Sequence, residues 1–346
     1  MELQTLLPRL LRGETLDAPT AATAVSAIMA GTAPEAAIGA FLAALAVRGE
    51  TEDELVGAAT AMRAHLAPVP HRRERVLDTC GTGGDGADTF NISTAAAFVC
   101  AAAGVAVGKH GNRSASSRVG SADVLEAAGV RLDLAPARAG ALLDALGFCF
   151  MFAPVHHGAM RHAAPVRRVL GARTIFNLLG PLANPAGATH QLVGVPDPRR
   201  LAPMAQVLGR LGAHRALVVH GADGLDELSL HAPSEAALHD RSSRVVERLT
   251  LDPRVLGLTP APLATLAGGD AAENARIMQA VLAGEPGPRA DVVALNAGVA
   301  LWVAEAAATP REGVARAREV LASGAGADVL ARYARESHHG VSGGPA

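Results

Sequence analysis

A glycine-rich turn directly after a short apolar segment constrains this chain more than any other feature. The turn, Gly81 to Gly86, reads Gly-Thr-Gly-Gly-Asp-Gly and follows the apolar segment 76–78. Glycines let backbone N–H groups approach an anion, and Ser93 begins an expected helix whose exposed amides favour negative charge. Because parallel strands place ligands at their carboxyl ends, the pattern predicts a phosphate-binding turn, although Ser93 could also act only as a helix cap.

The hydropathy pattern divides the chain into a helical block and an alternating block. Apolar residues recur at three- and four-residue spacing through residues 3–66, which predicts amphipathic helices, and Thr51 with Glu54 has the pattern of a capping box. From Arg75 onward, short apolar runs alternate with helical stretches, which is typical of a mostly parallel sheet flanked by helices. The expected fold class is α/β, with a small helical domain and a larger domain built on this sheet. The expected strands are 76–78, 105–107, 148–152, 216–220 and 245–251.

One segment, Arg173 to Pro185, interrupts the alternation, and we expect it to cross back to the helical block. The helical domain would then be discontinuous in sequence. The expected division is residues 1–70, completed by about 165–187, for the helical domain; 71–164 and 188–336 for the α/β domain; and 337–346 for a flexible tail.

Two familiar phosphate motifs fit the chain poorly. Gly81, Gly83 and Gly86 match the dinucleotide fingerprint, but the next expected helix begins only near Ser93, and the next strand ends on a lysine rather than an acidic ribose ligand. The segment 104–109 resembles a Walker A loop, yet it is one residue short, and a histidine stands where Ser or Thr should bind magnesium. Neither classical nucleotide site is therefore expected.

Lys109 is the single lysine among 31 basic residues. A lone lysine in the donor-rich segment Lys109 to Ser117 indicates a site that needs a compact ammonium group, and the neighbouring hydroxyls suit a phosphate ester. Asp226 and Glu227 supply adjacent hard oxygen ligands of the kind that hold Mg²⁺ together with substrate phosphates. Taken alone, this acidic pair is more typical of a solvated turn than of a metal site.

Composition excludes several classes of function. The 346 residues are 49% hydrophobic and 18% charged, which is ordinary for a globular protein, and the net charge of −2 gives no field that would recruit nucleic acid. No apolar run reaches the length of a membrane span, so no membrane partner is expected. Three widely spaced cysteines form neither a disulfide framework nor a zinc motif, which is consistent with a cytoplasmic location.

Together these segments closely resemble anthranilate phosphoribosyltransferases, enzymes of tryptophan biosynthesis. The resemblance runs from the N-terminal helices to about Tyr333. It implies a fold of the nucleoside phosphorylase/phosphoribosyltransferase type and a homodimer formed through the helical domain. The matching motifs are Asp78–Asp85, Thr89–Thr94, Lys109–Arg113, Gly120–Glu126, Phe152–Pro154, Pro165–Arg167, Arg173–Pro185 and Asp223–Glu227.

The resemblance also implies a reaction and a set of site residues. A pentosyltransferase of this family moves the phosphoribosyl group of 5-phosphoribosyl 1-pyrophosphate to the amine of anthranilate and releases pyrophosphate. Lys109, Asn112 and Arg167 are the implied catalytic residues, with Arg167 as the fork for the anthranilate carboxylate. Mg²⁺, expected as two ions with the pyrophosphate, is placed on Ser93, Asp226 and Glu227. The implied substrate-binding residues are Gly81, Gly84, Asp85, Thr89, Asn91, Ile92, Ser93, Thr94, Lys109, His110, Gly111, Asn112, Arg113, Ser114, Ala115, Ser116, Ser117, Ser121 and Arg167.

Two alternatives stay open on the sequence. A pyrimidine nucleoside phosphorylase shares the architecture and a Lys-His-Ser phosphate segment, but this chain has Lys-His-Gly-Asn from Lys109 onward. A non-catalytic nucleotide- or nucleic-acid-binding relative should lack Arg167 or the acidic pair and carry a basic surface, neither of which the sequence indicates.

Overall fold

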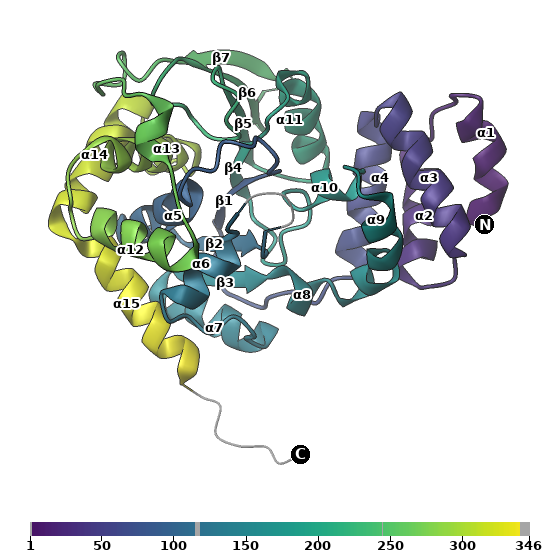
Figure 1. Ribbon diagram of the computed structural model, residues 1–346, viewed down its shortest axis with the longest axis horizontal. Helices are drawn as coiled ribbons and strands as arrows, with labels where there is room; N and C mark the ends of the chain where they lie inside the picture. The colour runs from purple at the N-terminus through teal and green to yellow at the C-terminus, as the bar shows by residue number, and fades with distance from the viewer. Residues whose placement is uncertain (1, 115–117, 244, 340–346) are drawn as a thin grey trace.

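The computed structural model describes residues 2–114, 118–243 and 245–339. A helical bundle from the N-terminal part of the chain stands at one side of a larger body, in which helices surround a central sheet (Figure 1). Ala115, Ser116 and Ser117, three of the expected substrate-binding residues, lie outside the described residues. No helix among the described residues is long and apolar enough to cross a membrane.

The N-terminal bundle forms where the sequence predicts amphipathic helices. Thr51 Oγ1 accepts a hydrogen bond from the Glu54 amide, and the Glu54 carboxylate accepts one from the Thr51 amide, which confirms the capping box. Glu54 is fully buried, and Arg48 pairs with its carboxylate. The elements of the bundle are a 3₁₀ turn (Leu3–Leu6), α1 (Leu7–Leu11), α2 (Ala18–Met29), α3 (Glu35–Arg48) and α4 (Glu52–Ala64).

The larger part is built on one seven-stranded sheet with the order β3-β2-β1-β4-β5-β6-β7. The strands β3, β2, β1, β4 and β5 are parallel, whereas β6 and β7 are antiparallel additions at one edge. The expectation of a mostly parallel sheet is confirmed. The chain runs outward from β1 to β3 on one side and from β4 to β7 on the other, so the strand order reverses between β1 and β4. The strands are β1 (Leu77–Gly81), β2 (Val107–Gly111), β3 (Phe148–Phe152), β4 (His190–Gly194), β5 (Arg215–Gly221), β6 (Ser234–Asp240) and β7 (Glu247–Leu251).

Alternate side chains of β5 enter two different hydrophobic cores. Leu217 and Val219 belong to the first core, and Ala216 and Val218 belong to the second, as the two-residue period of a strand requires. The first core lies under helices α5 (Ile92–Ala102), α6 (Ser121–Ala127), α7 (Pro136–Leu146), α12 (Ala271–Leu282), α13 (Pro288–Val303), α14 (Pro310–Ser323) and α15 (Ala325–His338).

The second core is shared between the sheet and the N-terminal bundle. Helix α11 (Leu201–Arg210) contributes buried residues such as Met204 and Leu208, and the same cluster contains Phe41 of α3 and Leu55 of α4. The segment that follows α9 (Ala164–Leu170), including α10 (Phe176–Leu179), packs into this cluster as well. The bundle is therefore joined to the α/β part by a continuous apolar contact.

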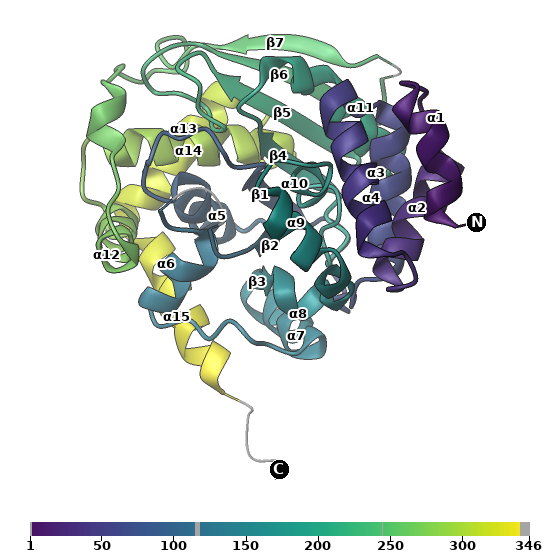
Figure 2. The ribbon, with the colours of Figure 1, turned by 45° about the vertical axis from the view of Figure 1, so that its right-hand side comes forward.

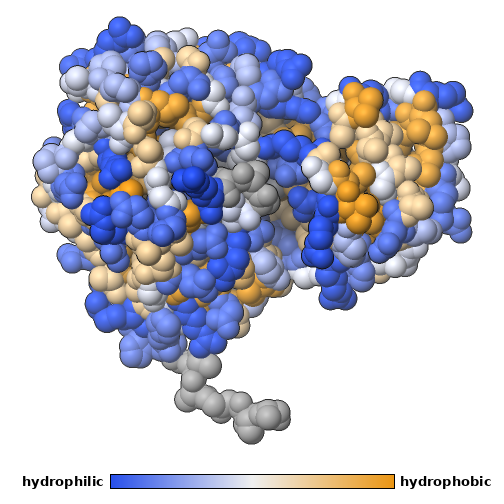
Figure 3. All heavy atoms as spheres, in the orientation of Figure 1, coloured by the Kyte–Doolittle hydropathy of each residue, from blue (hydrophilic) through white to orange (hydrophobic). Residues whose placement is uncertain are grey.

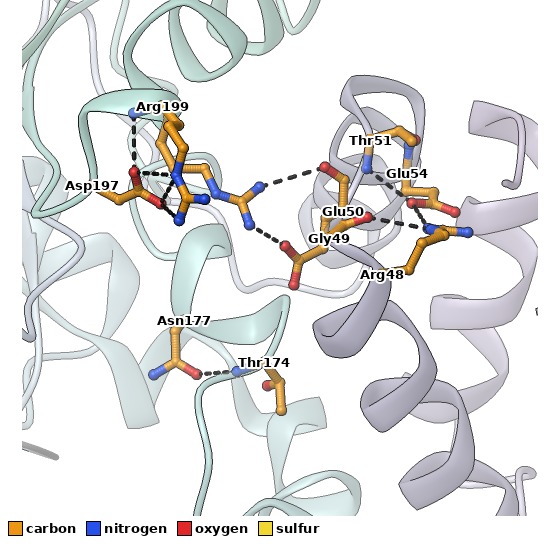
Figure 4. Close-up of polar contacts among 10 residues, drawn as sticks. Arg48, Gly49, Glu50, Thr51, Glu54, Thr174, Asn177, Asp197 and Arg199 are labelled. Atoms are coloured by element: carbon orange, nitrogen blue, oxygen red, sulfur yellow. Dashed lines mark hydrogen bonds and ion pairs between the residues drawn. The ribbon is translucent and has the colours of Figure 1, made fainter. Parts of the chain in front are cut away.

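Ion pairs reinforce this junction at its surface. The turn between α3 and α4 faces the loop between β4 and α11, and Figure 4 shows Glu50 on one side and Asp197 with Arg199 on the other. Arg200 bridges the two sides by an ion pair of 2.5 Å to Glu50. Arg210 of α11 adds a second pair to Asp53 of α4 at 2.6 Å.

The structure corrects the sequence predictions in three places. The first two strands begin one or two residues later than expected and continue into the glycine turn and into Lys109. Strands β4 and β6 were not expected at all. The tail was expected to begin at residue 337, but α15 continues to His338, because the buried Ser337 hydroxyl accepts a hydrogen bond from the Arg131 amide at 2.9 Å.

Candidate active site

A cavity of about 670 Å³ lies at the carboxyl ends of β1 and β2, beside the point where the strand order reverses. Helix α5 and helix α9 lie on opposite sides of these strand ends in both ribbon views (Figures 1 and 2). Open parallel sheets bind ligands at this position, because the connections diverge there and leave a crevice. All the predicted site residues that the structure describes line this cavity.

The glycine turn forms one wall and holds the acidic pair against it. The Gly83 amide donates a hydrogen bond of 2.7 Å to the Asp226 carboxylate, and the Ser93 amide at the start of α5 donates one of 3.2 Å to Glu227. A Cβ atom on Gly81 would overlap with the Asp226 carboxylate, so a side chain there would displace the acidic pair. The turn and the loop after β5 are thus one structural unit although they are far apart in the sequence.

The start of α5 lines the cavity, and its first amides already have acceptors. Besides the Ser93 amide, which donates to Glu227, the Ile92 amide donates to the Phe90 carbonyl oxygen at 2.8 Å and the Thr94 amide to that of Asn91 at 3.2 Å. The side chain of the N-cap residue Asn91 donates to the Val119 carbonyl oxygen and accepts from the Asn274 amide group, each at 3.2 Å. The buried Thr94 hydroxyl has no hydrogen-bond partner among the described residues. The helix start therefore favours an anion by its dipole rather than by free amides.

Lys109 reaches the same wall from the end of β2. Its ammonium group is buried and donates to the Thr79 carbonyl oxygen at 2.5 Å and to the Ser93 hydroxyl at 3.4 Å. Burial lowers the pKa of Lys109, and the negative charge of Asp78 opposes that shift. The single lysine of the chain is therefore a desolvated cation beside the acidic pair.

The acidic pair has the chemistry of a metal site that is completed by a substrate. Burial, followed by the nearby Asp85 charge, raises the pKa of Asp226, and burial with the Asp226 charge raises the pKa of Glu227. Two adjacent carboxylates that are buried lose solvation and repel each other when both are ionised. A divalent cation would offset both effects. Among the described residues, no group of three or more His, Cys, Asp or Glu side chains could hold a metal by itself. The donor set suits Mg²⁺ bound jointly by protein and phosphate oxygens.

A pair of neutral histidines forms the opposite wall. His110 Nδ1 lies 3.1 Å from the Gly180 carbonyl oxygen, and His110 Nε2 lies 3.2 Å from His157 Nε2. Since a carbonyl oxygen only accepts, His110 carries its proton on Nδ1 when it is neutral. Burial lowers the pKa of His110 to about 3 and that of His157 to about 4, so this wall is uncharged at neutral pH.

Arg167 of α9 supplies the cation on that side. Its guanidinium lies 5.5 Å from the centre of the Phe176 ring, and it forms no ion pair with any described residue. Burial lowers the pKa of Arg167, but an arginine stays protonated at neutral pH. A half-buried guanidinium without a carboxylate partner is suited to binding the carboxylate of a ligand.

Comparison with known proteins places this geometry in a family. Residues 73–327 match the α/β domain of a glycosyl transferase family, and residues 4–66 match the helical bundle domain of that family. The anthranilate phosphoribosyltransferase of Symbiobacterium thermophilum is 50% identical over 97% of this chain and 98% of its own length. That of Moorella thermoacetica is 52% identical over 95% of this chain and 96% of its own.

The chain belongs to the anthranilate phosphoribosyltransferase family. It is an enzyme, a glycosyltransferase of the pentosyl class. Solved structures agree with the assignment. The Thermus thermophilus anthranilate phosphoribosyltransferase superposes with a TM-score of 0.90 at 48% identity, covering 97% of this chain and 99% of that one. The Saccharomyces cerevisiae enzyme in complex with PRPP and Mg has a TM-score of 0.87 at 27% identity, covering 97% of each chain.

Two predicted residues of this phosphoribosyltransferase already have protein partners. The Arg113 guanidinium is paired with Asp123 at 2.8 Å and with Glu126 at 2.8 Å, so in this structure it braces α6 rather than facing the cavity alone. The Ser121 hydroxyl donates a hydrogen bond of 3.4 Å to the Asn112 carbonyl oxygen. Their assignment as substrate ligands stays a prediction.

The sequence did not single out several residues that shape this family's cavity. Met160 and Phe176 add apolar surface to the side of the cavity that carries the histidine pair and Arg167, and Asn274 of α12 reaches the start of α5 from the other end of the chain. A hydrophobic residue without a motif gives no local signal of a binding role. Asn274 could have been suspected only from its burial, which needs the fold.

Proposed function

We propose that the 670 Å³ cavity is where this enzyme transfers the phosphoribosyl group of 5-phosphoribosyl 1-pyrophosphate to the amine of anthranilate. The observation that carries the proposal is that two different sets of groups line the two sides of the cavity. Lys109, the glycine turn and the acidic pair form a wall for a metal-bound diphosphate, and Arg167, which forms no ion pair with any described residue, lines the other side of the cavity. A donor with phosphates and an acceptor with a carboxylate satisfy both walls.

On the donor wall, breaking the bond between ribose C1 and pyrophosphate builds negative charge on the leaving group. The Lys109 ammonium, the Gly84 amide and the positive end of the α5 dipole are fixed in place before the reaction, so they stabilise that charge without reorganising. The removal of water strengthens these interactions further, since Lys109 is buried.

Asp226 and Glu227, with the hydroxyl of Ser93, are the residues that we assign to magnesium, and two ions are expected with the pyrophosphate. Bound Mg²⁺ would neutralise diphosphate charge and thereby improve the leaving group. The raised pKa values of the two carboxylates support this assignment, because ionising both groups without a cation is unfavourable.

On the acceptor wall, Arg167 holds the anthranilate carboxylate, and Asn112 with the neutral face of His110 orients the ring. An aromatic amine is uncharged at neutral pH, so its attack on C1 requires positioning rather than a strong base. The neutral His110–His157 pair supports this arrangement, because a charged imidazole would compete with Arg167 for the carboxylate.

The wider organisation is part of the proposal. Residues 1–70 with about 165–187 form the helical domain, and 71–164 with 188–336 form the α/β domain; the shared core supports grouping α10 with the bundle. Figure 3 shows apolar surface on the helical side, and Leu11 of α1, Val47 of α3 and Val169 of α9 are exposed; both observations support a homodimer through this domain. The three free cysteines support a cytoplasmic location.

The test is the decay of anthranilate fluorescence when the purified protein receives 5-phosphoribosyl 1-pyrophosphate, with and without Mg²⁺. We expect decay that requires both the donor and the metal. Phosphorolysis of thymidine or uridine without anthranilate consumption would instead identify a pyrimidine nucleoside phosphorylase. Salt-sensitive binding to single-stranded DNA without turnover would identify the non-catalytic relative.

A further inference from the structure

Arg173 lies in a matching motif but is not among the predicted site residues. It contacts the glycine turn from the side away from the substrate cavity. Its two terminal nitrogens donate to the carbonyl oxygens of Gly83 at 2.6 Å and Thr82 at 3.2 Å. Arg173 does not line the central cavity; it lines a smaller one of about 290 Å³, whose wall also includes Thr82 and Gly84. The turn thus lies between the substrate cavity and the Arg173 guanidinium.

The geometry of the peptide group connects these two sides. In a trans peptide, the C=O and the following N–H point in opposite directions, and no described peptide bond is cis. Because one guanidinium binds the carbonyl oxygens of Thr82 and Gly83, the amides of Gly83 and Gly84 both point away from it. The Gly83 amide does so, since it donates to Asp226. The Gly84 amide has no acceptor among the described residues, and Gly84 is one of the residues that line the central cavity as well as the smaller one.

Gly84 shows how closely this contact is built. Its φ of 86° lies in the left-handed region that glycine favours, and a Cβ atom at this position would overlap with Arg173 Nη1. The guanidinium therefore occupies the space of the missing side chain. A hydrogen bond from a cation to a carbonyl oxygen also polarises the peptide unit, which makes the N–H on the far side a stronger donor.

We propose that Arg173 is a positioning residue for the phosphoribosyl donor, because it fixes and polarises from behind two peptide units of the turn, one whose amide holds Asp226 and one whose Gly84 amide is left for the diphosphate. This inference rests on the proposed function of the cavity. Arg173 lies between α9, which carries Arg167, and α10. The stretch from α9 to α10 therefore supplies residues to both substrate walls.

The experiment compares Arg173→Gln and Arg173→Lys with the wild-type enzyme. We expect Arg173→Gln to raise the KM for 5-phosphoribosyl 1-pyrophosphate, and to weaken Mg²⁺-pyrophosphate binding measured by calorimetry, by about ten- to one-hundred-fold, the range for hydrogen bonds to a charged group. Arg173→Lys keeps the charge but loses the planar fork, so its loss should be intermediate. The KM for anthranilate should stay within about twofold, since Arg173 does not reach the acceptor wall.

Arg199→Gln is the matched control, because Arg199 lies near the same junction, is paired only with Asp197 in Figure 4 and does not contact the turn. It should behave as the wild type. An unchanged donor KM in Arg173→Gln, equal losses for both substrates, or the same loss in Arg199→Gln would overturn the inference. If Arg173→Gln does not fold, as circular dichroism would reveal, the same criteria apply to Arg173→Lys. Wild-type protein that binds pyrophosphate but consumes no anthranilate would contradict the proposed function and leave the binding test of Arg173 intact.

Discussion

The donor wall and the acceptor wall of the cavity are formed by different kinds of chemical group. The donor wall uses backbone amides and buried charges that are held by the ends of β1, β2 and β5, and most of its groups bond to one another. The acceptor wall uses a neutral histidine pair, apolar side chains and the half-buried guanidinium of Arg167. We assign the charged diphosphate to the donor wall. We assign a mostly apolar ring, whose carboxylate binds one guanidinium, to the acceptor wall.

This difference predicts how each wall should respond to the loss of one side chain. A wall of mutually bonded charges should fail as a whole when one member is removed, because the remaining members are left uncompensated. A wall with one charged contact should lose affinity for one ligand and little else. The following changes test that contrast.

The largest effect is expected from removing the acidic pair. Asp226→Asn with Glu227→Gln keeps the shape of both side chains but removes the charge that we assign to magnesium. We expect a loss in kcat/KM of more than about one thousand-fold and no remaining activation by Mg²⁺, because metal stabilisation of the leaving group is lost. A magnesium titration of anthranilate fluorescence decay measures this. Wild-type turnover in the double variant would remove both residues from the metal site.

A smaller loss is expected for the buried lysine. Lys109→Met should lower kcat by about one hundred- to one-thousand-fold, the range for removing one fixed donor to a developing negative charge. Initial rates at saturating Mg²⁺ measure it, and the KM for anthranilate serves as the internal control. A change in that KM as large as the change in kcat would mean that Lys109 acts across both walls.

Arg167→Ala tests the acceptor wall directly. We expect the KM for anthranilate to rise by about ten- to one-hundred-fold, because a charge-assisted bidentate contact is lost, while the KM for the donor changes little. Arg167→Lys should recover part of the affinity. Equal losses for both substrates would show that the two walls are not independent.

The smallest effect at neutral pH concerns the histidine pair. The pKa values of His110, about 3, and His157, about 4, are lowered by burial, so below about pH 6.5 the unfolded chain binds protons that the folded protein does not. The free energy of unfolding should therefore fall as pH decreases from about 6.5 to 4, by up to about 1.4 kcal/mol per pH unit for each histidine. Urea unfolding at several pH values measures this slope.

His157→Gln is the control for that slope. It removes one of the two titrating groups and keeps a hydrogen-bond donor for His110, so the acid-side slope should become shallower. His190, whose pKa burial lowers to about 4, remains in the variant and keeps part of the slope. An identical slope in both proteins would show that His157 does not contribute.

The sequence was sufficient for the parts of the molecule that depend on local signals. Glycine spacing and the lone Lys109 indicated a phosphate-binding turn, whereas the acidic pair was assigned to it only through the family resemblance. Strand β6 was missed because its residues, Ser-Glu-Ala-Ala-Leu-His-Asp, include helix formers, and pairing with β5 overrides their preference. Strand β4 was missed because its buried polar residues, such as Gln191, break the apolar pattern, and Gln191 is satisfied by the distant Pro181 carbonyl oxygen.

Arg173 illustrates the limit of that reasoning at the site. The residue lies within a recognised motif, but its role follows from where the turn's carbonyl oxygens point. Those directions depend on backbone dihedral angles that glycine leaves open in the sequence. The contact with Gly83, ninety residues earlier in the chain, emerges only in three dimensions.

The second core has a consequence for how the molecule can move and come apart. Since α11 and the bundle bury their apolar faces in one cluster, the two parts should unfold as a single cooperative unit rather than as separable modules. A fragment that begins at residue 71 would expose the apolar face of α11 and should aggregate. Any motion that opens the cavity must therefore slide these packed helices by small steps, a shear rather than a wide hinge.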